Sequence, residues 1–275
     1  MKLVTDNDTL MRYVPNSIKP VAGEISLFEK IEVHLESAER WVKQNFTGSD
    51  LLNETDALNT NLVDALRQLV AAEALHRAVP SLDLVLTPNG FGVVSNNTIS
   101  PASKQRVDRL LGNLVALRDE AIEQTLLLLP KEEEWCVTEQ AHFFASTLFP
   151  NIDLVTLCGV NSTRWEKYLE LRSRVIGIEL TLAEDYFSPE LMSELRYLYL
   201  LGSLTAEQLY IVHGIRSQVV EVLQGNPING NRMRDLVNFI RHRPATFRTW
   251  HTSATAQLFS PPKFENKKKS SGYFF

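Results

Sequence analysis

The chain has 275 residues, of which 44% are hydrophobic and 22% are charged, the balance of an ordinary globular protein. No apolar run approaches the roughly 18 residues that suggest a membrane span. The opening stretch MKLVTDNDTLMRYVPNSIKP lacks the apolar core of a signal peptide. These features argue against membrane-spanning and secreted proteins, and we expect the protein to be cytoplasmic at synthesis.

Charge is distributed unevenly along the chain, although the net charge is only −5. Residues 226–275 contain nine Lys and Arg against two Asp and Glu, a balance of +7, so residues 1–225 carry −12. A basic end on an acidic body predicts contact with an acidic partner, with nucleic acid or with the acidic body of another copy. The competing interpretation is a solvated tail.

The first half of the chain predicts an arm, then three helices. Residues 1–25 show no period and contain two prolines, which predicts an arm with at most a short strand. Ser26 and Glu29 form a capping-box pattern that opens a helix ending near Phe46. Apolar residues at helical spacing predict further helices at 60–79, ended by Pro80, and at 102–128, after Ser100-Pro101.

Between the second and third of these helices, LDLVLTPNGFGVVS favours a β-hairpin over residues 82–95. Pro88-Asn89-Gly90 lies between two apolar runs, and Gly90 supplies the positive φ that such a turn requires, with Phe91 beginning the second run. A phosphate-binding loop is disfavoured, because the glycines do not directly precede a helix and no G-x-G-x-x-G occurs.

The second half predicts a series of shorter helices. They are expected at 138–148, from a cap at Asn161 or Ser162 to about Ala183, from Ser188-Pro189 to Gly202, from Thr205 to Gly225, and at 231–243. In the helix that ends near Ala183 we expect Trp165, Leu169, Ile176 and Leu180 to face inward. The predicted fold is mainly α and bundle-like, with a helical domain at 1–130, a second at 131–250 and an extended tail at 251–275.

One pattern suits a metal site. Glu73-x-x-His76 and Glu139-x-x-His142 are two Glu-x-x-His motifs, and Glu32 or Glu36 with Glu120 or Glu123 could complete the ligand set of a helical di-metal carboxylate enzyme. His76 is too near Pro80 for the centre of a bundle, and the 138–148 helix is short. We therefore predict no bound metal, no cofactor and no catalytic residues.

The basic end carries the candidate interaction residues. They are Arg232, Arg234, Arg241, Arg243, Arg248 and Trp250, with Phe247 interleaved, followed by Lys267, Lys268, Lys269, Tyr273, Phe274 and Phe275 in the tail. Arginines with aromatic residues suit a protein interface or nucleic acid. We favour the interface, because the acidic remainder of the chain would repel a polyanion.

Two stretches carry a resemblance to phage proteins. MKLVTDNDTLMRYVP and FEKIEVHLESAERWVKQNFTG, with Ala38-Glu39 and Gly48, resemble the start of phage head–tail connector (adaptor) proteins. LVAAEALHRAVPSLDLVLTPNGFGVVSNNTISPASKQRV and FENKKKSSGYFF resemble an uncharacterised phage or prophage family of gut bacteria. The resemblance implies a non-enzymatic virion protein that binds portal or tail components or copies of itself, made in the host cytoplasm.

Overall fold

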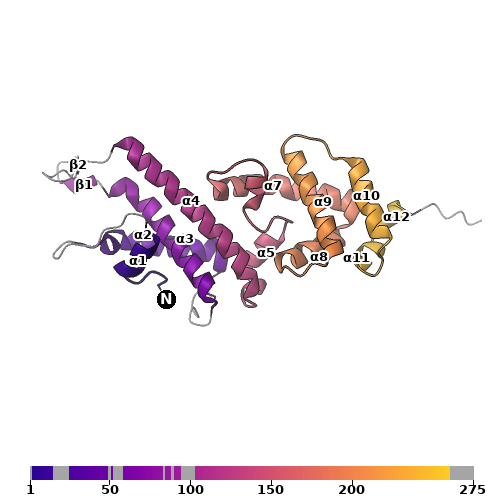
Figure 1. Cartoon of the computed structure of the whole chain (residues 1–275), viewed down its shortest axis with the longest axis horizontal. Coiled ribbons are helices and arrows are strands. Elements are labelled where there is room, and N and C mark those ends of the chain that lie inside the picture. The colour runs from indigo at the N-terminus through magenta and orange to yellow at the C-terminus, as the bar shows by residue number, and fades with distance from the viewer. Residues whose placement is uncertain are drawn as a thin grey trace, which may run out of the picture.

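A computed structural model describes residues 2–14, 25–48, 51, 58–82, 84–87, 90–93 and 103–260, with backbone alone for the two strands (Figure 1). These residues are mainly helical, which confirms the predicted fold class. In the first part of the chain lie α1 (Asn7–Tyr13), α2 (Leu27–Val42), the π-turn η1 (Lys43–Thr47), α3 (Thr60–Ala78), the 3-10 turn η3 (Val79–Ser81), β1 (Leu84–Thr87), β2 (Gly90–Val93) and α4 (Lys104–Leu128).

The remaining elements are mostly shorter. They are the 3-10 turns η4 (Leu129–Lys131) and η5 (Trp135–Val137), α5 (Glu139–Ala145), α6 (Asp153–Leu157), α7 (Arg164–Leu182), the π-turn η6 (Ala183–Phe187), α8 (Pro189–Leu200), α9 (Ala206–Leu223), α10 (Gly230–Arg241), α11 (Arg248–His251) and α12 (Ala254–Leu258). Helices α1 to α4 lie at one end of an elongated molecule, and α8 to α12 lie at the other (Figure 1).

Local capping chemistry explains where several helices begin. The Ser26 hydroxyl accepts a hydrogen bond from the Glu29 amide at 3.2 Å, and the Glu29 carboxylate accepts one from the Ser26 amide at 3.0 Å. Thr205 and Gln208 form the same reciprocal pair at the start of α9. Each pair satisfies amides that the first helical turn leaves without a partner, so these two predicted helix starts are confirmed.

The arm expected over residues 1–25 contains a helix instead. Helix α1 is capped by Asp6, whose carboxylate accepts from the Thr9 amide at 2.7 Å. The helix has seven residues, and only Leu10 among them is buried. One buried position cannot show a 3.6-residue period, so the sequence pattern did not reveal this helix. The predicted cap Ser100 lies outside the described residues, and α4 begins at Lys104 after Ser103.

The two strands form an antiparallel pair at one end of the molecule (Figure 1). Leu84 lies opposite Val93, and Thr87 lies opposite Gly90. Pro88 and Asn89, the expected turn residues, lie outside the described residues.

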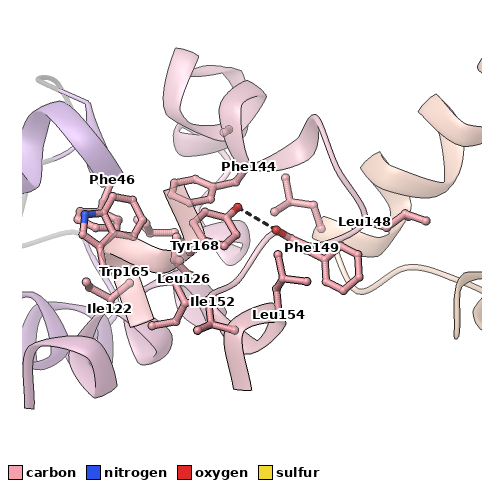
Figure 2. Close-up of a cluster of buried hydrophobic side chains, with 14 of the residues drawn as sticks. Phe46, Ile122, Leu126, Phe144, Leu148, Phe149, Ile152, Leu154, Trp165 and Tyr168 are labelled. Carbon is pink, nitrogen blue, oxygen red and sulfur yellow. Dashed lines mark hydrogen bonds between the residues drawn. The ribbon is translucent and has the colours of Figure 1, made fainter. Parts of the chain in front are cut away.

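The hydrophobic core continues across Pro130, the expected boundary between two domains. Phe46 of η1 packs against Trp165 of α7 and Phe144 of α5, with ring centroids 4.7 and 6.2 Å apart (Figure 2). Its carbonyl accepts a hydrogen bond from the Trp135 indole at 2.6 Å. The 1–130 and 131–250 units therefore share buried aromatic side chains, and independent folding of each unit stays a prediction.

Two glycines at the centres of helices occupy opposite environments. A Cβ added to Gly214 in α9 would lie 2.6 Å from Cδ1 of Leu236, because α10 approaches α9 closely at this point. A Cβ added to Gly177 in α7 would meet nothing within 4 Å. The first glycine allows two helices to pack, whereas the second only lowers the helix propensity of α7.

We predict that Gly214→Ala and Gly177→Ala change stability in different directions. Both gain the same helix propensity, so the difference between them reports crowding against Leu236. Overpacking of this kind costs about 1–3 kcal/mol, and Gly177→Ala should gain about 0.5–1 kcal/mol. Urea unfolding of the two variants and the parent measures the difference; equal free energies of unfolding for the two variants would contradict the close approach.

Candidate functional site: an interaction surface on α5 and α7

A buried cluster of charges fixes the position of α7. The guanidinium of Arg118 in α4 lies 2.7 Å from Glu166 in α7, 3.0 Å from Asp119 in α4 and 3.5 Å from Glu73 in α3. The side chains of Arg118, Asp119 and Glu73 are 5, 2 and 7% exposed. Buried charges need partners because desolvation is costly, so α3 and α4 must stay together at this point, and α7 joins them through Glu166, whose side chain is 53% exposed.

Asp119 also supplies the cap that α7 lacks in its own sequence. Thr163 precedes the helix in a left-handed conformation and makes no side-chain cap, and the expected caps Asn161 and Ser162 lie further upstream. Instead the Asp119 carboxylate accepts from the Arg164 amide at 2.6 Å. A carboxylate at a helix N-terminus is favourable both as an acceptor and through the helix dipole.

The orientation of α7 leaves part of its apolar surface uncovered. Tyr168, Leu171 and Val175 are buried, as is Trp165. The expected inward positions Leu169, Ile176 and Leu180 are 42, 42 and 52% exposed, so that expectation was wrong. They recur at i, i+7 and i+11 and share one helix face, which we call the α7 stripe. The apolar arc of α7 is thus wider than the surface that the other described residues cover.

A groove adjoins one end of this stripe. Two hollows of about 530 and 260 Å³ share Gln44, Glu139 and Gln140 in their walls, so they adjoin. The larger is also lined by Glu134 and Val137, and the smaller by Phe143 and Leu169. We call the two together the α5 groove. Val137 is 78% exposed, and contiguous exposed apolar side chains mark contact sites.

Phe143 is held in place although it is 38% exposed. The Arg172 guanidinium lies 3.6 Å from the centre of its ring, a cation–π contact. The same guanidinium donates to the Tyr168 hydroxyl at 2.7 Å, to the Ser146 hydroxyl at 2.6 Å and to the Phe143 carbonyl. The wall of the groove is therefore pre-organised, which lowers the entropy lost when something binds there.

The predicted basic residues divide into engaged and exposed groups. Arg232 pairs with Glu221 at 2.9 Å, and Arg243 pairs with Glu207 at 3.1 Å while its guanidinium lies over the Phe239 ring. Arg234, Arg241 and Arg248 are exposed. Arg234 and Arg241 are seven residues apart on the outer face of α10, so the molecule presents a basic surface at its α10–α12 end (Figure 1).

Trp250 is not an exposed anchor, which corrects the sequence-based interpretation. It is 2% exposed, and its indole N–H donates to the Tyr186 carbonyl at 2.9 Å. Phe247 is fully buried as well. Both rings belong to the core of the C-terminal helices, so neither can stack on a nucleic-acid base. Lys267–Lys269 and Tyr273–Phe275 lie outside the described residues.

The candidate metal ligands are not brought together. Glu73 is held by Arg118 and by Arg77, whose Nε lies 2.7 Å away. Glu139 and His142 are exposed on α5. Across the part of the chain that the structure describes, no three His, Cys, Asp or Glu side chains are placed to hold a metal ion.

Sequence reasoning missed the α5 groove and the Arg118 cluster. The groove combines η1, the stretch before α5, α5 itself and α7, which are far apart in the sequence. The cluster gave one usable signal, since Arg118 and Asp119 interrupt the apolar face of a long amphipathic helix. A polar pair on a buried face requires partners elsewhere in the fold.

Comparison with known proteins adds one similarity. Residues 18–145 match a family of unknown function (DUF6712). The match crosses Pro130 and ends at Ala145, the last residue of α5, so it includes the acidic wall of the α5 groove and excludes α7. No curated protein and no solved structure matches the chain. In the described ranges, no helix is both long enough and apolar enough to cross a membrane.

We predict that Arg118→Met lowers the free energy of unfolding by about 3–5 kcal/mol, because it leaves Asp119 buried without its cation and Glu73 with Arg77 as its one remaining cation among the described residues. Lys167→Met is the matched control, since Lys167 pairs with Glu170 at the surface and should contribute less than about 1 kcal/mol. Adding Glu73→Met to Arg118→Met should recover part of the loss. Chemical denaturation measures all three, and equal losses for the two single variants would show that the cluster is not a structural constraint.

We also predict that the purified protein holds no stoichiometric iron or zinc at Glu73, His76, Glu139 and His142. The Glu73 carboxylate is already shared between two arginines, and among the described residues no three His, Cys, Asp or Glu side chains are placed to hold a metal ion. Elemental analysis is the measurement. Near-stoichiometric metal that disappears when both histidines are changed to Ala would refute this prediction.

Proposed function

We propose that the chain is a non-enzymatic structural protein of a phage or prophage, a head–tail connector (adaptor) that assembles through protein–protein contacts. The observation that carries the proposal is the presence of two uncovered and chemically different surfaces on one chain. An acidic and apolar surface, the α5 groove with the α7 stripe, lies in the middle of the molecule. A basic surface lies at the α10–α12 end, where the basic tail begins (Figure 1).

Complementary surfaces at different places on one chain favour head-to-tail assembly. Such a heterologous contact closes into a ring when the rotation between neighbouring copies is a whole-number fraction of 360°. Ring formation is what a connector between a portal and a tail requires. The proposal therefore draws on the charge split of +7 and −12 as well as on the resemblance of the first 50 residues to adaptor proteins.

A single tail contact should be weak by itself. Burying Tyr273, Phe274 and Phe275 contributes a few kcal/mol at about 25 cal/mol per Å² of apolar surface. Fixing the backbone costs about 1–2 kcal/mol per residue, which offsets much of this. Several contacts closed into one assembly gain from effective concentration, so a ring is stable where a pair is not.

Further contacts belong to the same proposal. The hairpin expected over residues 82–95, with Pro88, Asn89, Gly90 and Phe91 as its candidate residues, is a second candidate contact for a neighbouring virion component. Arg234, Arg241 and Arg248 are a third, because their exposed guanidinium groups suit carboxylates on a protein partner. The protein would be made in the host cytoplasm and join the virion there.

The proposal predicts that deletion of Lys263–Phe275 leaves the chain folded but abolishes its association. Far-ultraviolet circular dichroism should be unchanged, because the hydrophobic core of the described residues is built from residues that precede position 261 and stay in the shortened chain. Sedimentation velocity of the protein alone, and co-purification with the portal and tail proteins encoded nearby, measure association. If the shortened chain associates with the same partners and to the same size as the parent, the tail has no part in assembly.

A further inference from the structure

We infer that the tail, Lys263–Phe275, of one copy docks in the α5 groove and along the α7 stripe of a neighbouring copy. This inference rests on the proposed function, since it names the receptor for the tail within the same assembly. Two properties of the groove carry it: its charge matches the tail's lysines, and its apolar wall matches the tail's aromatic residues.

The charge of the groove is suited to a lysine run. Glu134 and Glu139 line it, and Glu132 and Glu133 precede them in the same stretch of chain. Among the residues that the structure describes, Lys43 is the one cation that lines the two hollows. Lysine ammonium groups beside exposed carboxylates gain modest Coulomb energy and, more importantly, fix the orientation and register of the bound segment.

The apolar wall of the α5 groove suits the aromatic residues at the end of the tail. Phe143 and Leu169 line the smaller hollow, and Ile176 follows on the α7 stripe. Arg172 holds the Phe143 ring through a cation–π contact at 3.6 Å, so an aromatic side chain can pack on the ring without reordering the wall. Aromatic pairs contribute beyond the area that they bury.

The order of residues in the tail agrees with the order along the groove. Three residues separate Lys269 from Tyr273, which extended backbone spans in about 10–14 Å. The lysines thus reach the Glu134 and Glu139 end while the aromatics reach Phe143 and Leu169. The 13 residues from Lys263 extend over at most about 45 Å, which limits how far apart the α12 end of one copy and the groove of its neighbour can lie.

The test measures binding of a fluorescein-labelled peptide of residues 261–275 by anisotropy. The peptide is titrated onto the full chain and onto the chain lacking Lys263–Phe275, whose groove has no competing tail. We expect the double variant E134K/E139K to bind it about tenfold more weakly, from two reversed surface pairs. A peptide with Glu at 267, 268 and 269 should bind E134K/E139K better than it binds the parent. Circular dichroism verifies the fold of each variant.

Matched variants separate the groove from the general surface. E120K/E184K reverses two exposed carboxylates on α4 and η6 and should leave peptide binding unchanged. L169S/I176S removes the apolar wall and should weaken binding, whereas Val33→Ser, at a side chain 77% exposed on α2, should not. Absence of binding to the parent, or equal binding by E134K/E139K and E120K/E184K, overturns the inference.

The outcomes distinguish this inference from the proposed function. If tail deletion abolishes assembly but the groove variants bind the peptide as well as the parent does, the receptor for the tail lies elsewhere. The proposed function is then still supported. Groove-dependent peptide binding, together with unchanged assembly of the shortened chain, confirms the docking site and removes the tail from assembly. The tail could instead dock in the groove of its own chain. In that case the shortened chain binds the peptide tightly while the full chain stays monomeric, and this result contradicts docking between copies.

Discussion

Burial of one guanidinium among three carboxylates is the constraint on which the arrangement of the molecule depends. Arg118 contacts Glu73, Asp119 and Glu166, which belong to three different helices, α3, α4 and α7. Arg118, Glu73 and Asp119 are buried, so moving α3 away from α4 would separate desolvated charges; Glu166, which is 53% exposed, and the Asp119–Arg164 amide bond connect α7 to them. Apolar packing alone tolerates small shifts, whereas a buried ion cluster admits one arrangement.

This constraint also sets the rotation of α7 about its own axis. Glu166 must face Arg118, and the Arg164 amide must meet Asp119, so Tyr168, Leu171 and Val175 turn toward the core. The remaining apolar residues, Leu169, Ile176 and Leu180, then face outward. The α7 stripe is therefore a consequence of the charge cluster, and burying it requires another chain or another segment of this one.

The charge pattern and the shape of the molecule reinforce one another. The elongated chain has a basic end and an acidic, apolar middle, so its complementary surfaces lie at different places along its length (Figure 1). The matched family segment ends with α5, so the α5 groove is built partly from that segment and partly from α7 beyond it.

The sequence by itself determined the helical class, most helix positions and several caps, although not the cap of α7, because local caps depend on residues within a few positions of one another. The Ser26–Glu29 and Thr205–Gln208 pairs formed as their spacing predicted. Tertiary structure decided what the sequence could not show: α1 in the arm, burial of Trp250, the pairing of Glu73 with arginines, and the exposure of Leu169, Ile176 and Leu180. A helical period identifies an apolar face, but which part of that face is covered depends on partners distant in the chain. Here Arg118 and Asp119 made that choice, through the cost of leaving a buried charge unpaired.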